Sequence, residues 1–387
     1  MRYGDSIFGS LLKLVDRRQF AAIVERHDGD AYDKKFDSWN HLVSLICAQL
    51  NGAGSLRELE AAWQANAHQH YHLGVGALRR STLSDANRRR PPAIFAELFS
   101  RLVEQAGGGL RRDGREMVRL IDATPIPLGK IVDWARWNGR IRGLKLHVAY
   151  DPKADLPERF AITPATVNDI SFGRQVPLDK GVTYVVDKAY CHYGWWTEID
   201  QAGAFFVTRR KTNARFRTLR RRPLKRCRGE GFTVLADAEV KLASKGDSQL
   251  AVAMRRIRLK RDNGQTLDLL TNDTRRSAVA IAALYKRRWQ IELLFRWIKQ
   301  HLNIRRFIGN GDNAIRLQIL AAMIAFVLLR IAARLHRIAM PAIRFAQLVG
   351  QSLFVRKPLA RIDKPPEVNL HRPRHRANPN QLRFSYA

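Results

Sequence analysis

One stretch, from Tyr285 to Lys299, constrains the fold and the chemistry of this chain more than any other. Read as a helix, at roughly 100° per residue, it gathers a phenol, a carboxylate and two cations within a strip about 60° wide: Tyr285, Arg288, Glu292 and Lys299. A neighbouring apolar strip would hold this helix on a core: Leu284, Ile291, Phe295, Ile298 and Leu302. We therefore predict that the Glu292 carboxylate lies at the rim of a core, where Arg288 favours its ionised form.

The same spacing also fits a solvated helix face, because Arg288 and Glu292 form an i,i+4 ion pair. The complete pattern, Y-x2-R-x3-E-x6-K, resembles the signature of the YREK branch of DDE transposases, the type-four insertion-sequence family. This resemblance implies that Glu292 is the third metal-binding carboxylate of a ribonuclease H-like fold. It also implies that Tyr285, Arg288 and Lys299 hold the DNA at the end of the transposon.

The net charge of +33 indicates a partner that carries many negative charges. Nucleic-acid phosphate is the commonest such partner, and a membrane surface is the weaker alternative. The apolar run 319–329 is too short to span a bilayer and predicts a buried helix. Three widely spaced cysteines, without a C-x2-C pair, favour neither a zinc site nor a disulfide framework, and no signal peptide opens the chain. We expect a cytoplasmic protein that binds no membrane.

Residues 1–109 read as an all-α N-terminal domain that closes at Gly107-Gly-Gly109. Within it, a helix capped by Ser81 carries the cations predicted to contact DNA: Arg79, Arg80 and Arg88, with Arg89 and Arg90 beside them. A solvated basic helix is the alternative. His68, His70 and His72 alternate at a helix end without a Cys or acid nearby, which favours a polar loop over a metal site.

An aliphatic strand at 117–124 places Leu120, Asp122 and Thr124 on one face by period-two alternation. From the residues alone, an Asp that starts a turn before Pro125 is the better interpretation of Asp122. The resemblance implies that Asp122 is the first catalytic carboxylate, since the family has Asp-x-Thr or Asp-x-Ser on its first core strand. Strands at 144–150 and 159–163 would complete the opening meander of a ribonuclease H-like fold.

A further aliphatic strand, starting at Thr183, ends in an acid, Asp187, at the kind of position where parallel sheets place chemistry. The family usually has Asp-Arg-Gly-Tyr there, and this chain has Asp187-Lys188-Ala189-Tyr190. The resemblance implies that Asp187 is the second carboxylate and that Lys188 and Tyr190 lie toward DNA. The next strand ends in Arg209, which we also predict to face DNA. A nucleophilic Cys191–His192 pair is disfavoured, because neighbours in sequence rarely face each other.

Eleven Arg or Lys residues and no acid lie between Arg209 and Arg228, a run that indicates phosphate contacts rather than a folded core. Strand-like segments at 232–240, 249–260 and 265–271 follow, with a tight hairpin at Asp262-Asn-Gly264. They predict a β-rich insertion at about 212–275. The tail from Lys357 onward, rich in Pro, Arg and Asn, suggests a flexible basic extension.

Together these patterns predict an α/β protein with a ribonuclease H-like catalytic domain at 110–340, after the helical domain and before a basic extension at 341–387. Three carboxylates meeting in this domain would form an all-oxygen site suited to two Mg²⁺ ions, for which Mn²⁺ could substitute. The resemblance implies cutting at terminal inverted repeats, joining of the 3′ ends to target DNA, and a dimer in the complex with double-stranded DNA. A metal-dependent nuclease of the same fold and a non-catalytic, domesticated DNA-binding protein remain alternatives.

Overall fold

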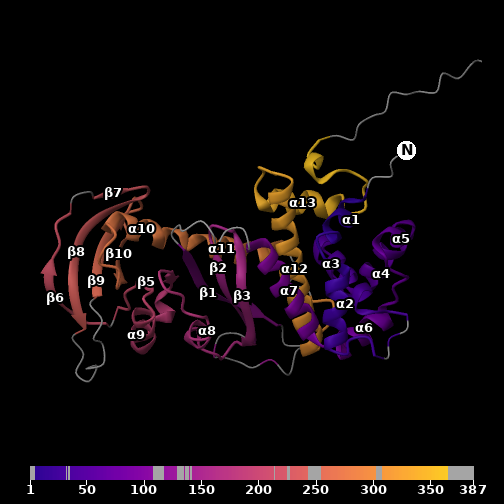
Figure 1. Ribbon diagram of the computed structural model, residues 1–387, viewed down its shortest axis with the longest axis horizontal. Coiled ribbons are helices and arrows are strands. Elements are labelled where there is room, and N and C mark those ends of the chain that lie inside the picture. Colours follow the sequence, from indigo (N-terminus) through magenta and orange to yellow (C-terminus); the bar gives the residue numbers. More distant parts are fainter. Residues whose placement is uncertain are drawn as a thin grey trace, which may run out of the picture.

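The computed structural model describes residues 5–31, 33, 35–107, 117–128, 135, 139, 142–212, 214–224, 227–242, 254–301 and 307–364. The molecule is long, with a helical body at one end, a twisted sheet through the middle, and further strands of that sheet at the other end (Figure 1).

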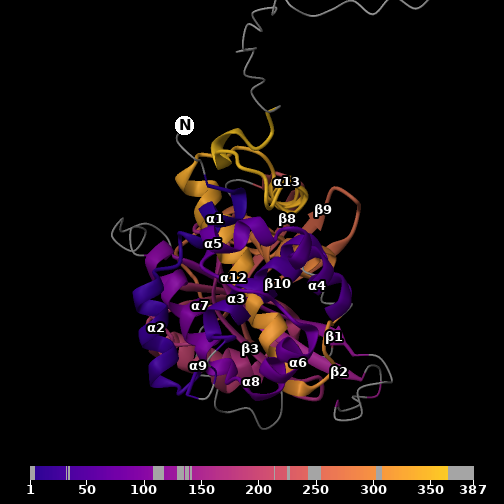
Figure 2. The same ribbon diagram turned by 90° about the vertical axis from the view of Figure 1, so that its right-hand side faces the viewer.

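The helical body is built from both ends of the chain. Its central element is α12 (Asp312–Leu335), which packs against α3 and α7 and is surrounded by the N-terminal helices when the molecule is viewed end on (Figure 2). By length and composition α12 could cross a membrane, but 83% of its most apolar window is buried, so it serves as a core helix. This confirms the buried helix predicted at 319–329. The N-terminal helices around it are α1 (Ile7–Leu12), α2 (Arg17–Arg26), α3 (Ser38–Asn51), α4 (Leu56–Ala65), α5 (His70–Leu73), α6 (Arg80–Arg89) and α7 (Pro92–Gly107).

The C-terminal segment is folded further than the sequence predicted. Residues 342–351 form α13 (Ala342–Gln351), whose buried side chains Phe345 and Val349 belong to the same core, and which packs against α3 and α12. The Ile7 amide then donates to the Val355 carbonyl at 3.0 Å. The prediction of an extension from residue 341 is therefore wrong as far as residue 364, because apolar burial fixes this part. Residues 365–387 lie outside the described residues.

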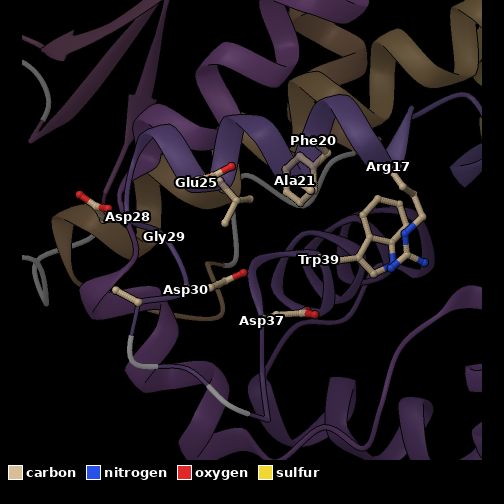
Figure 3. Close-up of a pocket in the computed structure, with 11 residues that line it drawn as sticks. Arg17, Phe20, Ala21, Glu25, Asp28, Gly29, Asp30, Asp37 and Trp39 are labelled. Carbon is tan, nitrogen blue, oxygen red and sulfur yellow. The ribbon is translucent and has the colours of Figure 1, made fainter.

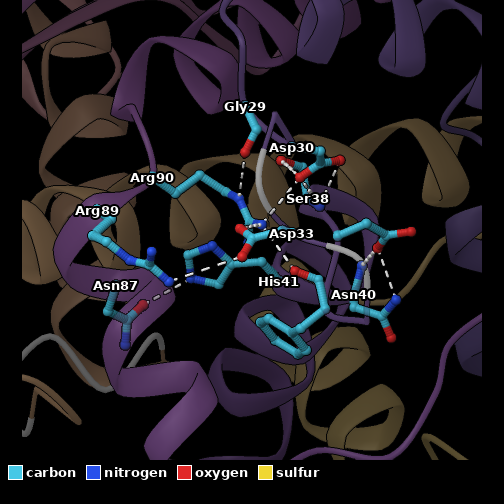
Figure 4. A network of polar contacts seen from close by, with 11 residues as sticks. Gly29, Asp30, Asp33, Ser38, Asn40, His41, Asn87, Arg89 and Arg90 are labelled. Atoms are coloured by element: carbon cyan, nitrogen blue, oxygen red, sulfur yellow. Dashed lines mark hydrogen bonds and ion pairs between the residues drawn. The ribbon is translucent and has the colours of Figure 1, made fainter.

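A buried polar network joins α6 to the rest of the helical body (Figure 4). Arg90 is 2% exposed, and its Nη2 donates to Asp30 at 3.0 Å, to Asp33 at 2.6 Å and to the Phe36 carbonyl at 2.9 Å. Beside it, His41 Nε2 lies 2.8 Å from the Asn87 side-chain oxygen. The last turn of α6 is thus fastened through buried hydrogen bonds rather than through apolar packing alone.

His41 predicts how the stability of this body depends on pH. Burial, with Arg90 nearby, lowers the pKa of His41 to about 3, although the bond to Asn87 opposes the shift. Between that value and the unfolded value of about 6.5 the unfolded chain binds more protons, so stability falls as the pH falls. We expect His41 to contribute a loss of roughly 1.4 kcal/mol per pH unit between pH 6.5 and 4.

Chemical denaturation over this pH range checks the expectation, with His41→Gln as the comparison. The variant should lose a corresponding part of the pH dependence. An unchanged slope in the variant would show that His41 is not the responsible group.

A ten-stranded sheet extends from the middle of the molecule to the end away from the helices. Its strand order is β3-β2-β1-β4-β5-β10-β9-β8-β6, and β7 pairs with β8 beside this path. The first five strands of this order form the middle of the molecule. β2 and β3 run antiparallel to β1 as a meander, whereas β4 and β5 run parallel to it. This order is that of a ribonuclease H-like core, as expected from the sequence. Its strands are β1 (Val118–Pro127), β2 (Gly143–Asp151), β3 (Leu156–Pro164), β4 (Thr183–Val186) and β5 (Phe205–Arg209).

Two layers of helices cover the sheet. We call one side the α10 face, which carries α10 (Ala278–Arg287) and α11 (Trp289–His301), and the other the α9 face, which carries α8 (Asp169–Gly173) and α9 (Tyr193–Gln201). Side chains alternate between them along each strand. Leu120 and Val185 are buried on the α10 face, whereas Ile121 and Val186 are buried on the α9 face.

The predicted β-rich insertion is present, and it extends the core sheet instead of forming a separate unit, because β10 pairs with β5. Part of the basic run forms an exposed edge strand, β6, where solvent accommodates its charges. The predicted hairpin is confirmed, with Gly264 in the left-handed region at φ +83°. The insertion consists of β6 (Phe216–Arg221), β7 (Arg228–Gly229), β8 (Phe232–Leu242), β9 (Met254–Arg261) and β10 (Thr266–Thr271).

Candidate active site

Asp122 lies in the middle of β1 and points to the α10 face, because it continues the alternation of Leu120. Its side chain is 16% exposed. One carboxylate oxygen accepts a hydrogen bond from the Ala123 amide at 2.8 Å, and the other accepts one from Arg288 Nη1 at 2.9 Å. The strand thus fixes this acid on the side of the sheet where α11 packs.

Asp187 follows the last residue of β4 and continues the alternation of Val185, so it belongs to the same face. Its backbone carbonyl accepts from the Tyr190 amide at 3.0 Å and from the Thr208 hydroxyl at 3.2 Å. These bonds fix the backbone where the strand turns into a short 3-10 helix. The side-chain oxygen Oδ1 is buried without a hydrogen-bond partner.

Glu292 lies in the first turn of α11, and the continuous helix predicted over 285–299 is interrupted just before it. α10 ends at Arg287, and the chain passes through Arg288 with 3-10-like bonds, Arg288 N to Tyr285 O and Ile291 N to Arg288 O. Tyr285 and Glu292 therefore belong to two helices that meet at Arg288. The predicted apolar strip is buried on both, except that Leu302 lies outside the described residues.

The three acids interact electrostatically, although 65 and 105 residues separate them in sequence. Burial is the main cause that raises the pKa of Asp122 to about 6. The Ala123 amide and Arg288 oppose the rise, and the negative charges of Asp187 and Glu292 add to it. The fold thus places Asp187 and Glu292 close enough to Asp122 for their charges to influence its pKa. That the three acids form one catalytic site stays a prediction.

Arg288 bridges two of these acids. While Nη1 binds Asp122, Nη2 donates to Glu292 Oε1 at 2.5 Å. Burial disfavours its charge, but Tyr285, Asp122 and Glu292 together raise the pKa of Arg288 above its ordinary value. The guanidinium therefore acts as an internal counter-ion for both acids. The sequence predicted its pairing with Glu292 but not its bond to Asp122. Its predicted contact with DNA stays a prediction.

The donor set fits a hard divalent cation in its chemistry, because all three predicted ligands are carboxylates. The buried oxygen Oδ1 of Asp187 has no hydrogen-bond partner, so it has a lone pair available for a cation. Within the described residues, however, no group of three or more His, Cys, Asp or Glu side chains is arranged to hold a metal ion. The bridge made by Arg288 explains this arrangement, since a cation shared by Asp122 and Glu292 would have to replace the guanidinium.

The other residues predicted to contact DNA near the acids differ in accessibility. Lys188 is exposed, and Arg209 and Lys299 are half-buried. Tyr285 is buried, which raises the pKa of its hydroxyl to about 12 and keeps it protonated. The prediction for Tyr190 is wrong in this structure: its side chain is fully buried beside Trp195 and has no surface to offer to DNA.

The cations of α6 are on the surface, as a DNA contact requires. Arg79, Arg80 and Arg88 are exposed, and Arg88 pairs with Asp85 at 2.9 Å. The helix begins at Arg80 with Arg79 as its N-cap residue, so the predicted cap at Ser81 is wrong. Asn313 at the start of α12 donates to the carbonyls of Asn87 and Arg90, both at 2.9 Å, and so holds the end of α6.

Two surface residues of α11 beside Glu292 were missed from the sequence. Trp289 is 51% exposed and Leu293 is 42% exposed, and the Arg296 guanidinium lies 5.6 Å from the Trp289 ring centre. A tryptophan and a leucine on the polar side of an amphipathic helix were the available signal. They form an exposed apolar surface next to the candidate acid.

Two other candidate sites, the Cys191–His192 pair and a pocket in the helical body, do not show an arrangement suited to catalysis. Cys191 Sγ contacts the Arg209 carbonyl and His192 Nδ1 accepts from the Trp195 amide, which confirms that they do not face each other. A pocket of about 420 Å³ lies beside α2 in the helical body (Figure 3), with Arg17 stacked on Trp39 at 4.3 Å. It contains none of the three acids. The site is therefore defined by converging carboxylates and not by this pocket.

A ribonuclease H-like sheet with acids on β1, directly after β4 and on the following helix α11 is the arrangement expected of a DDE-type enzyme. Residues 113–328 match the family described as "Transposase DDE domain", and residues 3–76 match "Domain of unknown function (DUF4372)". Because the first match covers more than half of the chain, the protein belongs to the DDE transposases.

Named relatives agree with this family. The "Putative transposase y4zB" of Sinorhizobium fredii is 59% identical over 304 residues, which cover 79% of this chain and 85% of that protein. The "Probable transposase for insertion sequence element IS5377" of Geobacillus stearothermophilus is 31% identical over 261 residues, 66% of this chain and 68% of that one. The chain is thus an insertion-sequence transposase. A solved piggyBac transposase synaptic complex with hairpin DNA is 10% identical, with a TM-score of 0.49 over 93% of this chain and 82% of that one.

Proposed function

We propose that this transposase cuts double-stranded DNA at the terminal inverted repeats of its element and joins the freed 3′ ends to target DNA, by phosphoryl transfer at Asp122, Asp187 and Glu292. The observation that supports this most directly is the convergence of the three carboxylates on the α10 face, with Asp122 influenced by the charges of both others. No covalent intermediate between protein and DNA is required.

Two Mg²⁺ ions, or Mn²⁺, held by these carboxylates would lower the pKa of the attacking water or 3′ hydroxyl and stabilise the leaving oxygen. The protein's own contribution is to fix the acids on rigid strands and to supply Arg288 as a charge that can leave them. Once it is released from Asp122 and Glu292, the Arg288 guanidinium would be able to bind a DNA phosphate through two parallel hydrogen bonds.

Tyr285, Arg288 and Lys299 would then form a clamp on the phosphates beside the scissile bond. Tyr285 can donate a hydrogen bond because its hydroxyl stays protonated. Exposed Lys188 and half-buried Arg209 lie near the turn after β4 and at the end of β5, where they can extend this contact along the backbone.

Replacement of Lys299 tests the clamp. Lys299→Ala should weaken binding of an end duplex about tenfold and reduce the slope of log affinity against log salt by about 0.9, because one phosphate contact is lost. Fluorescence anisotropy over a salt series measures both. Lys13→Ala, at the far end of the helical body, is the control for the change in net charge. Equal effects of the two replacements would contradict the assignment.

Joining distinguishes a transposase reaction from simple cutting by the same fold. Pre-cut end duplexes incubated with the protein, Mg²⁺ and a target plasmid should give products in which end DNA is covalently linked to the plasmid. Cleavage of uncut ends without joined products would favour a nuclease. Coordinated cutting of two ends also requires two active sites, so we expect a dimer in the DNA complex. We place the reaction in the bacterial cytoplasm, on the nucleoid.

A further inference from the structure

Strand β9 carries a cation at every second position: Arg256, Arg258 and Lys260. The residues between them, Ile257 and Leu259, are buried in the core that includes α10. Alternation therefore directs the three cations, which we call the β9 row, to the α9 face. The candidate active site is on the α10 face, so the β9 row is a separate surface. Figure 1 shows β9 in the insertion end of the sheet, with α10 near the upper ends of these strands.

One member of the β9 row, Arg258, is held in place by a half-buried acid. Asp268 on the neighbouring strand β10 accepts from Arg258 Nε at 2.8 Å and Nη2 at 3.2 Å, and Arg210 Nε lies 3.3 Å from it. Burial would raise the pKa of Asp268, but Arg258, Arg256 and Arg210 together hold it below its usual range. A single carboxylate thus orders two guanidinium groups and leaves an excess of positive charge.

The surroundings of the row leave these cations accessible. Ala236 on β8 is opposite Arg258, and Thr233 and Thr266 are on either side of Lys260. Arg258 and Lys260 are exposed, whereas Arg256 is half-buried. The short side chains on β8 leave Arg258 and Lys260 accessible on that side. Alternate residues on a strand are about 7 Å apart, close to the separation of neighbouring phosphates along one nucleic-acid strand.

The β9 row also differs from the basic run that the sequence singled out. In that run Arg220 and Arg222 lie near Glu239, and β6 forms the edge of the sheet. Among the described members of the run, Arg210 is the one shown to reach Asp268. The row therefore consists of cations from a different part of the chain, which share a face because they alternate along β9. Strand pairing through β10 brings Arg210 beside them.

We propose that the β9 row, with Arg210, binds the backbone of duplex DNA without reading its sequence, on the side of the sheet away from the acids. It would hold a stretch of DNA other than the end being cut. This inference rests on the proposed function, because it takes DNA as the substrate, and it adds a second contact surface to it.

The test compares two triple variants of the full chain that lose the same charge. Arg256→Gln, Arg258→Gln and Lys260→Gln remove the row, whereas Lys13→Gln, Arg18→Gln and Arg101→Gln remove three exposed cations from the helical body. The probe is a random-sequence duplex of about 30 base pairs without a terminal repeat. The row variant should bind at least tenfold more weakly than the control variant, with a salt slope lower by about 2.7. Equal affinities and slopes for the two variants would overturn the proposal.

The triple variant could fold poorly, because it removes the bond between Arg258 and Asp268. A single replacement that leaves this bond intact controls for such a defect. Lys260→Gln should melt like the wild-type protein and lower the slope by about 0.9. An unchanged slope would count against the row. If the wild-type protein neither cut nor joined ends while the row variant lost duplex binding, the proposed function would fail and the row would stand. If the wild-type protein joined ends and the row variant bound the random duplex normally, only the row would be wrong.

Discussion

Replacing any one of Asp122, Asp187 and Glu292 by Ala should reduce end cleavage by at least ~10³-fold, since a ligand lost from a two-metal site costs several kcal/mol of transition-state stabilisation. Binding of the end duplex should stay within a few-fold of wild type, because the clamp and the cations of α6 are retained. Single-turnover cleavage on gels and anisotropy binding measure the two quantities separately.

Asp169→Ala is the matched control for these variants. Asp169 is also a partly buried carboxylate of the core, but it pairs with Lys145 at 2.8 Å on the α9 face. Its loss should change cleavage by less than about tenfold, in keeping with a structural ion pair of limited exposure. Wild-type cleavage by one of the three acid variants would show that this residue is misassigned.

Replacing Asp237 by Ala should cost roughly 3–5 kcal/mol of stability, the largest effect we expect away from the acids. Asp237 and Arg255 are 5% and 2% exposed, and the guanidinium donates to both carboxylate oxygens, at 2.7 and 2.5 Å. Arg255 also donates to the carbonyls of Asp273 and Arg276, so it connects β9 to the segment before α10. Without Asp237, a buried positive charge would remain uncompensated. Chemical denaturation of the full chain measures the loss.

Asp5→Ala provides the comparison, because Asp5 forms an exposed ion pair with Lys13 and its removal should cost only roughly 0–1 kcal/mol. Replacing both Asp237 and Arg255 by Leu and Met should restore part of the lost stability, since an apolar pair of similar volume leaves no buried charge. Equal stability of Asp237→Ala and Asp5→Ala would contradict the buried-pair assignment.

Alternation and motif spacing were sufficient to predict much of the core. An acid that continues the apolar alternation of its own strand, as Asp122 does after Leu120, must point into the layer that covers that face. Asp187 follows the same rule after Val185. These local patterns fix a side chain's face, and the resemblance to a known signature supplied the reason to expect that the two faces coincide.

The break at Arg288 could not be predicted, because the apolar strip continues across it. Leu284 and Ile291 are buried on successive helices just as they would be on one helix, so periodicity alone does not distinguish the two cases. The bridge from Arg288 to Asp122 joins residues 166 positions apart, and sequence spacing shows only its i,i+4 contact with Glu292.

The errors at Tyr190 and in the C-terminal segment have the same origin. A motif predicts which residue type stands at a position, but it does not predict how deeply that side chain is buried. Tyr190 is buried in the core beside Trp195. In α13, Phe345 and Val349 are spaced for a helix, yet their burial depends on α3, about 300 residues earlier. The basic composition near the C-terminus led us to predict an extension and not this packing against residues distant in sequence.

The most direct test of the central claim, that three distant carboxylates form one divalent-metal site, is anomalous diffraction from the full chain bound to Mn²⁺ and an end duplex. We predict anomalous density within ligand distance of Asp122, Asp187 and Glu292, about 2.0–2.6 Å from their oxygens, with Arg288 moved from the carboxylates to a phosphate. Density that lacked any one of these acids, or Arg288 still bridging Asp122 and Glu292 beside a correctly placed scissile phosphate, would contradict it.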